Sequence, residues 1–101
     1  MSSSKFFKSL KVNVEHEPQN ERFLIPFSPQ PVSLSYRATA DGWEITKVDV
    51  SQDARKLRMG NTLMEYVLET AKRDKINVWP ACSYAKNFFA RFPRYQELMP
   101  K

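Results

Sequence analysis

The chain has 101 residues, which is enough for one domain but too few for two domains with separate cores. Hydrophobic residues make up 42% and charged residues 27%, a balance that excludes a disordered or fibrous protein. The net charge of +5 favours an anionic partner without identifying it.

Two further features of the composition limit the class of protein. No apolar run approaches the ~20 residues of a membrane-spanning helix. A lone cysteine, Cys82, cannot form an internal disulfide, which fits a reducing compartment such as the cytoplasm. We therefore expect a protein with no membrane partner.

The first half of the chain predicts strands. We expect residues 1–9, rich in lysine and serine, to form a flexible terminus before a single domain over residues 10–101. Four stretches predict strands, and residues 10–15 and 32–37 alternate apolar and polar residues with the period of two that is typical of half-buried strands. Asp41-Gly42 is a hairpin signal between the last two. The predicted antiparallel strands cover residues 10–15, 22–25, 32–37 and 43–50.

The second half predicts helices around a fifth strand. Apolar residues over 57–74 recur at helical spacing, with charged residues largely opposite. Residues 76–79 follow as a short strand ended by Pro80, and residues 83–92 carry aromatic side chains at helical spacing. The shared face of the first helix is expected to hold Met59, Leu63, Tyr66, Val67, Thr70 and Ala71.

A basic segment, Arg55-Lys56-Leu57-Arg58-Met59-Gly60, joins the fourth strand to the first helix. The first amide groups of a helix and its positive dipole end attract anions. Arginine would add charge-assisted hydrogen bonds to a phosphate, and Gly60 would let a ligand approach the backbone. The segment is therefore either a phosphate-binding loop or a solvated basic turn.

Cys82 stands at the junction between the fifth strand and the second helix. A helix N-terminus favours the nucleophilic thiolate, whereas most unpaired cysteines are buried packing residues, so both roles stay open. His16 is the only histidine, and no spacing links it to Cys82. One cysteine and one histidine also fall short of a zinc ligand set, so we expect no metal.

Two late segments then carry a family resemblance, Pro80-Ala81-Cys82-Ser83-Tyr84 and Phe92-Pro93-Arg94-Tyr95. With Glu15-His16, Arg22-Phe23 and Leu34-Ser35-Tyr36, in this order of elements, the chain resembles the GNAT acetyltransferase superfamily over nearly its whole length. It is most similar to the minimal single-domain N-acetyltransferase-like proteins that carry a cysteine after the fifth strand. The resemblance implies an α+β fold whose mixed, mainly antiparallel sheet is splayed between the fourth and fifth strands.

The same resemblance implies that acetyl-CoA binds in that gap. The superfamily holds the CoA diphosphate in a loop of pattern Arg/Gln-x-x-Gly-x-Gly/Ala. Arg55 matches the first position and Gly60 the last, while Arg58 replaces the middle small residue and could either obstruct the loop or grip phosphate. Lys56 stands where the small group commonly has another glycine. The implied diphosphate contacts come from Arg55, Lys56, Leu57, Arg58, Met59, Gly60 and Asn61.

The remaining site residues also follow from the resemblance. The backbone of Val48 to Val50 would pair with the pantetheine arm, and Asp49 is the candidate base for the attacking amine. Many superfamily members protonate the leaving thiolate with a tyrosine in the last helix, where this chain has Phe88 or Phe89. Cys82, Tyr84 or solvent would have to serve instead, and Cys82 is otherwise a transient acetyl carrier. Further cofactor contacts are expected from Ser83 and Asn87.

The sequence therefore predicts an acetyl-CoA-dependent N-acetyltransferase acting on a primary amine. The amine could belong to a small molecule, a protein lysine or a protein N-terminus. One alternative is a module of the same fold that binds an acyl-CoA or a protein without chemistry. Another is a small basic nucleic-acid-binding domain, favoured only by the charge, because the chain carries no nucleic-acid-binding motif.

Overall fold

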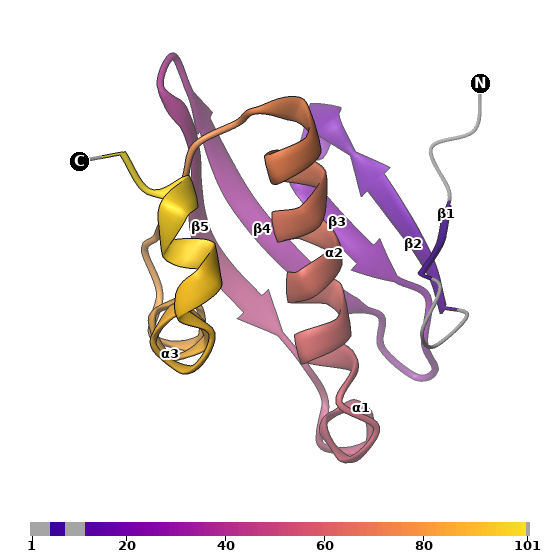
Figure 1. The fold of residues 1–101 in the computed structure, drawn as a ribbon. Coiled ribbons are helices and arrows are strands. Elements are labelled where there is room, and N and C mark those ends of the chain that lie inside the picture. Colours follow the sequence, from indigo (N-terminus) through magenta and orange to yellow (C-terminus); the bar gives the residue numbers. More distant parts are fainter. Residues whose placement is uncertain (1–4, 8–11, 101) are drawn as a thin grey trace.

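A computed structural model of the chain describes residues 5–7 and 12–100 (Figure 1). Strands dominate the first half and helices the second. The elements in chain order are β1 (Lys5–Phe7), β2 (Val12–Glu17), η1 (Pro18–Asn20), β3 (Arg22–Ile25), β4 (Val32–Thr39), β5 (Gly42–Asp49), α1 (Gln52–Lys56), α2 (Met59–Asp74), β6 (Val78–Pro80), α3 (Ser83–Arg91) and η2 (Pro93–Leu98), where η marks a 3₁₀ helix.

The strands form one sheet in the order β1-β2-β3-β4-β5-β6. Neighbours pair antiparallel from β1 to β5, and β6 pairs parallel to β5. This topology confirms the predicted mixed, mainly antiparallel sheet of an α+β fold.

The N-terminal segment contributes one strand to the sheet. Lys5–Phe7 forms β1 and pairs antiparallel with β2, while the flexibility expected of residues 1–9 stays a prediction. The rest of that segment, and the first two residues of the strand predicted over 10–15, lie outside the described residues.

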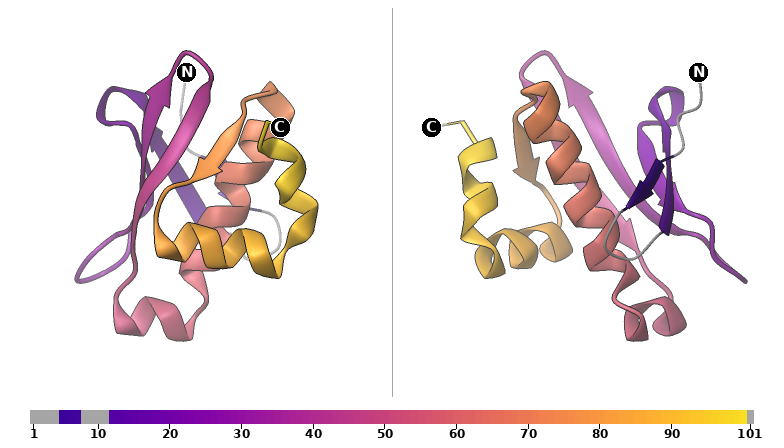
Figure 2. Two further views of the ribbon diagram at one scale, coloured as in Figure 1. Left: turned by 90° about the vertical axis from the view of Figure 1, so that its left-hand side faces the viewer. Right: turned by 45° about the vertical axis from the view of Figure 1, so that its right-hand side comes forward.

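The helices cover one face of the sheet. Figure 2 (left) shows α2, α3 and η2 on the same side of the strands. There α2 packs on β3 and β4, while α3 packs on β5 and β6. We call the opposite side of the sheet the open face. The core fills the covered side, and its largest fully buried side chains are Phe23, Ile25, Leu34, Ile45, Leu63, Met64, Leu68, Val14, Val32, Val67 and Val78.

The long helix begins later than the sequence predicts. Instead of one helix over 57–74, the chain forms the short helix α1, then turns at Leu57 and Arg58 before α2. Ser51 caps α1, because its hydroxyl accepts a hydrogen bond from the Ala54 N–H at 3.2 Å. A serine just before Gln52 and Asp53 is a recognisable helix-start signal, and it could have predicted this element.

The buried surface of α2 is also wider than the predicted face. Met64 and Leu68 are fully buried, although they lie outside that face. The reason is that α2 packs against η2 as well as against the sheet. The Tyr95 hydroxyl in η2 donates to the Glu69 carboxylate on α2 at 2.7 Å.

In the part of the chain that the structure describes, no helix combines the length and apolar character that crossing a membrane requires.

Candidate active site

The two parallel strands separate halfway along β5. Their register pairs Trp43 with Val78 and Ile45 with Pro80, and the last contact is the Ala81 N–H donating to the Ile45 carbonyl at 2.9 Å. Beyond this point β5 continues to Asp49, whereas the other chain segment turns into α3. We call this divergence of the two backbones the β5–β6 gap, which is the predicted splay.

A bulge in β5 lies where the gap begins. Tyr36 pairs with Ile45 and Ser35 with Lys47, so Thr46 is an extra residue on β5. An extra residue shifts the alternation of a strand by one position. The Val48 side chain therefore packs on the core, and its backbone N–H and carbonyl point toward the gap, as those of Ile45 point toward β6.

The first turn of α2 offers unused hydrogen-bond donors. The first bond within this helix runs from the Thr62 N–H to the Arg58 carbonyl at 3.1 Å. The N–H groups of Met59, Gly60 and Asn61 donate to no carbonyl among the described residues, as expected at a helix N-terminus. No side chain caps them either, so these donors have no partner among the described residues; Met59 and Asn61 are partly exposed, whereas Gly60 is buried.

Arg58 adopts the backbone conformation that favours glycine. Its φ is 56° and its ψ is 31°, in the left-handed region, which L-residues with a side chain visit at a cost. The superfamily pattern that the sequence resembles has a small residue at this position. Arg58 therefore makes the turn despite its side chain, which is exposed.

Positive charge surrounds this turn. Arg55, Lys56 and Arg58 are all exposed, and none of the ion pairs among the described residues uses them. Leu57, in their midst, is 59% exposed. The dipole of α2 adds positive potential at the same end.

Gly60 lets α3 approach α2. A Cβ at this position would overlap the Tyr84 hydroxyl oxygen and would lie 2.8 Å from Cγ2 of Val50. The Tyr84 hydroxyl donates to Oδ1 of Asn61 at 2.9 Å. Glycine is therefore required here for space, and the result is a phenol held at the N-terminus of α2.

A cavity of about 210 Å³ adjoins this phenol, lined by Asn61, Tyr84, Asn87, Phe88 and Arg91. Burial raises the pKa of Tyr84, while the positive charges of Arg55 and Arg91 act in the opposite direction. Tyr84 is thus a neutral phenol at physiological pH, with cations nearby that would stabilise an anion. Phe88 lies one helical turn further along the same cavity wall.

Cys82 and Ser83 lie at the start of α3, and neither side chain is bonded to a described group that would activate it. Cys82 is the N-cap residue of α3, but its side chain makes no capping hydrogen bond. The thiol is partly buried and packs on the core, whereas Ser83 is exposed. His16 cannot serve as a base for the thiol, because its ring stacks on Phe23 and its Nε2 lies 2.6 Å from the Tyr36 hydroxyl.

Asp49 lies apart from the cavity at Tyr84. Its carboxylate is exposed and lies 3.4 Å from the Lys47 ammonium. Because Val48 faces the core, the alternation of the strand places both charged side chains on the open face. Asp49 also lines a separate hollow of about 400 Å³ with residues of the loop before β4.

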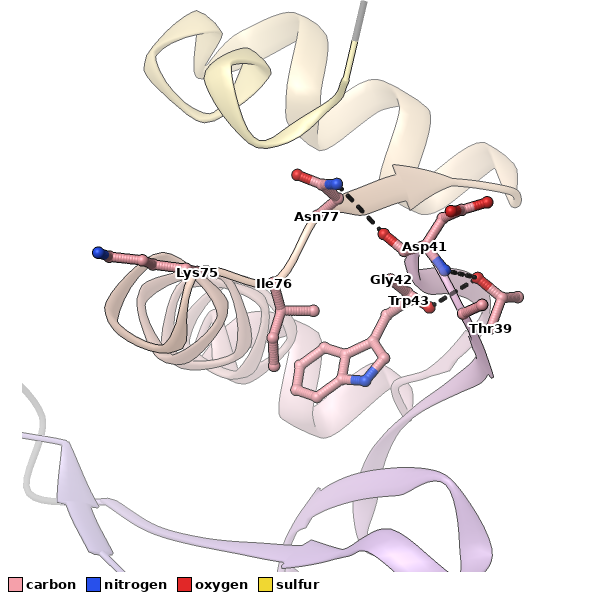
Figure 3. Close-up of a pocket in the computed structure, with 8 residues that line it drawn as sticks. Thr39, Asp41, Gly42, Trp43, Lys75, Ile76 and Asn77 are labelled. Carbon is pink, nitrogen blue, oxygen red and sulfur yellow. Dashed lines mark hydrogen bonds between the residues drawn. The ribbon is translucent and has the colours of Figure 1, made fainter.

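A larger hollow lies at the other end of α2, lined by Thr39, Ala40, Asp41, Gly42, Trp43, Lys75, Ile76 and Asn77 (Figure 3). Its volume is about 480 Å³. Asn77 closes one side by donating to the Asp41 carbonyl at 3.2 Å. None of the predicted site residues lines this hollow. The candidate site is therefore located by its hydrogen-bond donors and charged side chains, and not by the volume of the hollow.

A comparison with protein families decides the family. The family described as GCN5-related N-acetyl-transferase matches residues 22–98, which is most of the chain. The chain belongs to the GCN5-related N-acetyltransferase (GNAT) family. None of the curated proteins matches it.

A solved structure of similar fold supports the architecture. It is the solution structure of a GCN5-like candidate N-acetyltransferase from Staphylococcus aureus, with a TM-score of 0.71 and 20% sequence identity. The match covers 88% of this chain and 88% of that chain. At this identity the likeness concerns the fold of the GNAT chain and not its substrate.

The structure brings only part of the predicted site together. Asn61, Tyr84 and Asn87 share one cavity, beside the turn that carries Arg55 to Gly60. Arg91 was missed, although it lines the same cavity. It stands two turns after Tyr84 in a predicted helix, so helical spacing could have placed both on one face. Neither Asp49 nor Cys82 is among the residues that line this cavity.

Proposed function

We propose that this protein transfers the acetyl group of acetyl-CoA to a primary amine. One observation carries the proposal: the uncapped N-terminus of α2, surrounded by unpaired cations, lies at the open end of the β5–β6 gap. That combination suits a diphosphate joined to an extended chain, which is the form of CoA.

The residues of the α1–α2 turn fit the diphosphate. The N–H groups of Met59, Gly60 and Asn61 would donate to its oxygens, and Arg55 would add a charge-assisted hydrogen bond. Arg58 already holds the left-handed backbone that the turn requires. Its exposed side chain is therefore free to contact phosphate, so we propose that it grips the diphosphate and does not obstruct it.

The gap fits the rest of the molecule. The Val48 backbone would pair with the amides of the pantetheine arm, as a further strand would. Val50 and Gly60 pack together at the end of the gap. The bound cofactor supplies an acetyl thioester, and everything else in the reaction falls to residues of this chain.

Proton transfer then needs an acid and a base. The amine nitrogen bonds to the acetyl carbon, the carbon–sulfur bond breaks, the nitrogen loses one proton and the sulfur gains one. We propose that the Tyr84 phenol donates the proton to sulfur through water, because its hydroxyl lies against Gly60, at the diphosphate end of the gap. Asp49, on the open face, is our candidate for accepting the amine proton through water.

Cys82 has a different role in this proposal. Its thiol packs on the core, and the only histidine is held by Tyr36. A thiol without a base is a poor acetyl acceptor. We therefore propose direct transfer to the amine, with Cys82 as a packing residue.

The test compares two tyrosine positions on α3. Tyr84→Phe should lower kcat by about 10²-fold or more, as expected for loss of a general acid. Tyr84→Phe combined with Phe88→Tyr places a phenol one turn along the same cavity and should restore part of the rate. Cys82→Ala serves as the control and should retain the parent rate.

The outcomes separate the alternatives. Loss of CoA release in Cys82→Ala with full activity in Tyr84→Phe would contradict the assigned roles. Binding of acetyl-CoA with no transfer to any amine would favour the non-catalytic module. That module is the second candidate, because Phe88 or Phe89 stands where many family members are expected to carry a tyrosine.

A further inference from the structure

Two side chains of complementary chemistry lie together on the open face beside the gap. Glu44 on β5 and Trp79 on β6 are directly opposite in the parallel register. Their neighbours Ile45 and Val78 are fully buried. Because side chains alternate along a strand, Glu44 and Trp79 both point to the open face. The next pair along, Ile45 with Pro80, is the last before the strands separate.

The Trp79 side chain lies on the surface of the open face and is not part of the core. It is partly exposed, and it is absent from the described side chains that pack on the core. No hydrogen bond among the described residues uses its indole N–H. A large aromatic ring on a solvated sheet face, next to a candidate active site, offers its π face to a cation.

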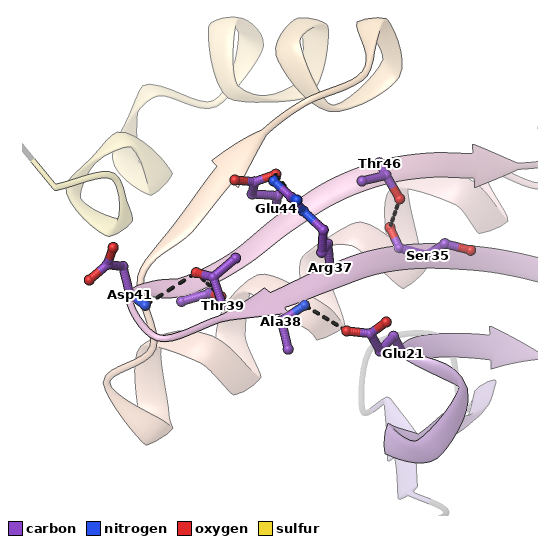
Figure 4. Close-up of polar contacts among 9 residues, drawn as sticks. Glu21, Ser35, Arg37, Ala38, Thr39, Asp41, Glu44 and Thr46 are labelled. Atoms are coloured by element: carbon purple, nitrogen blue, oxygen red, sulfur yellow. Dashed lines mark hydrogen bonds and ion pairs between the residues drawn. The ribbon is translucent and has the colours of Figure 1, made fainter.

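Glu44 keeps one carboxylate oxygen available. Nε and Nη2 of Arg37 both donate to its Oε1, at 3.1 and 2.6 Å, and Figure 4 shows the two side chains together on adjacent strands. Its Oε2 accepts no hydrogen bond from any described residue. The Glu44 side chain as a whole is 32% exposed.

The charge of the molecule is distributed unequally between its two sides. Among the described strands, the open face carries Glu15, Glu17, Glu44 and Asp49 together with Arg22, Arg37 and Lys47. The two signs nearly balance there, although the chain has a net charge of +5. Among the described residues, unpaired cations gather instead at the α1–α2 turn. An anionic molecule would be drawn to that turn, and the open face does not repel a cationic one.

The open face also lacks walls. All the described helices that pack on the sheet lie on its other side (Figure 2). Sites for small molecules usually enclose most of the ligand surface, which this face does not. A flat polar face beside the gap suits an extended segment of a protein or peptide.

From these observations we infer that Glu44 and Trp79 form a subsite for a cationic side chain that neighbours the acetylated lysine in a protein or peptide acceptor. The inference rests on the proposed acetyl transfer. The lysine would enter the gap from the open face, while the CoA diphosphate is held on the helix side. The neighbouring cation would lie over the Trp79 ring and contact Oε2 of Glu44.

The test uses two matched peptides and the full chain loaded with acetyl-CoA. One peptide carries an arginine near its single lysine, and the other carries glutamine in place of that arginine. In a heteronuclear NMR titration, the arginine peptide should shift the Trp79 indole N–H signal, assigned with Trp79→Phe, and the glutamine peptide should not. The arginine peptide should also show a kcat/KM about fivefold higher, the size expected from one exposed cation–π contact with one surface ion pair.

Matched variants locate the effect. Glu44→Gln and Trp79→Ala should each bring the ratio of kcat/KM for the two peptides close to one, while acetyl-CoA still binds. Glu17→Gln is the control, because Glu17 also pairs with an arginine on the open face, at 2.6 Å from Arg22, but it lies on β2, far from the gap in the strand order. Glu17→Gln should keep the preference.

Failure of the subsite and failure of the proposed function give different results. If both peptides are acetylated equally and Trp79 does not respond, the subsite is wrong and acetyl transfer stands. If acetyl-CoA does not bind, the proposed function is wrong, and the indole signal still reports whether the arginine peptide binds at Trp79. Acetylation of spermidine but of neither peptide would overturn the inference in favour of a small polyamine.

Discussion

Arg58 shows how a residue type and a backbone conformation can disagree. The turn between α1 and α2 needs a positive φ, which glycine adopts without cost and arginine does not. Arg58 nevertheless sits at φ 56°. Arg58 therefore lowers the local stability of the turn, and it places a guanidinium at the N-terminus of α2, the proposed anion site.

Replacing Arg58 tests this exchange. Arg58→Gly should raise the free energy of unfolding by about 0.5 to 1 kcal/mol, because it relieves the positive φ. Arg58→Ala should give no gain, since alanine meets the same strain. Thermal unfolding of the two variants measures the difference, and equal melting temperatures would contradict a strained turn. Weaker acetyl-CoA binding in both would support the phosphate contact.

His16 makes stability depend on pH in a defined window. Burial lowers the pKa of His16 below the value of about 6.5 that it has in an unfolded chain. Between these two pKa values the unfolded chain binds more protons than the folded protein. The free energy of unfolding should therefore fall as the pH drops below about 6.5, until the folded-state pKa is passed.

Denaturant unfolding at a series of pH values measures this effect. His16→Gln cannot titrate and should lose the decrease that begins below about pH 6.5. It keeps a side-chain oxygen that can accept the Tyr36 hydroxyl hydrogen bond. If the parent and the variant lose stability in parallel over this window, the lowered pKa of His16 is not responsible.

The site could be predicted only in part, because it depends on contacts between residues that are far apart in the sequence. Gly60 and Asn61 were expected at the site from the loop pattern, and Tyr84 from the resemblance at the start of the second helix. Nothing in the sequence shows that Tyr84 lies against Gly60. That contact depends on how α3 docks on α2, and it explains why glycine is needed at the last loop position.

At the scale of elements, the contact between α2 and α3 is the one that builds the candidate site. The Tyr84 ring packs over the first turn of α2 because Gly60 has no Cβ. Gly60→Ala should therefore destabilise the protein by about 1 to 3 kcal/mol through overpacking. Its cost should be smaller in a Tyr84→Phe background, because the oxygen closest to the added Cβ is absent there.

A double-mutant cycle measures the coupling. The sum of the two single changes in unfolding free energy should exceed the change in the double variant. An additive result would mean that the Tyr84 hydroxyl does not restrict Gly60, and that Val50, at 2.8 Å from the added Cβ, carries the whole conflict.

The elements themselves were largely predictable, and their irregularities were not. Periodicity located the strands from Arg22 onward and both long helices within a few residues. The bulge at Thr46 has no signal in the sequence, because it is defined by pairing with β4. The short helix α1 was missed because its five residues are too few to show an apolar periodicity, and the start of α2 was predicted two residues too early, at Leu57.

At the scale of the whole molecule, the sheet separates two chemical environments. The helix side presents the amide groups and cations of the α1–α2 turn. The open face presents Glu44, Trp79 and Asp49. The β5–β6 gap connects the two sides, so an anionic cofactor and a cationic acceptor would approach the reacting atoms from opposite directions. The net charge alone could not reveal this, because it sums over both sides.

The most direct test of the account is a heteronuclear NMR titration of the full chain with acetyl-CoA. The amide signals of Met59, Gly60 and Asn61, together with that of Val48, should shift in a saturable manner. Together these shifts would map the diphosphate at the N-terminus of α2 and the pantetheine arm along β5. A titration in which these four signals stay unchanged would contradict the central claim, that the N-terminus of α2 and the β5–β6 gap form one binding site.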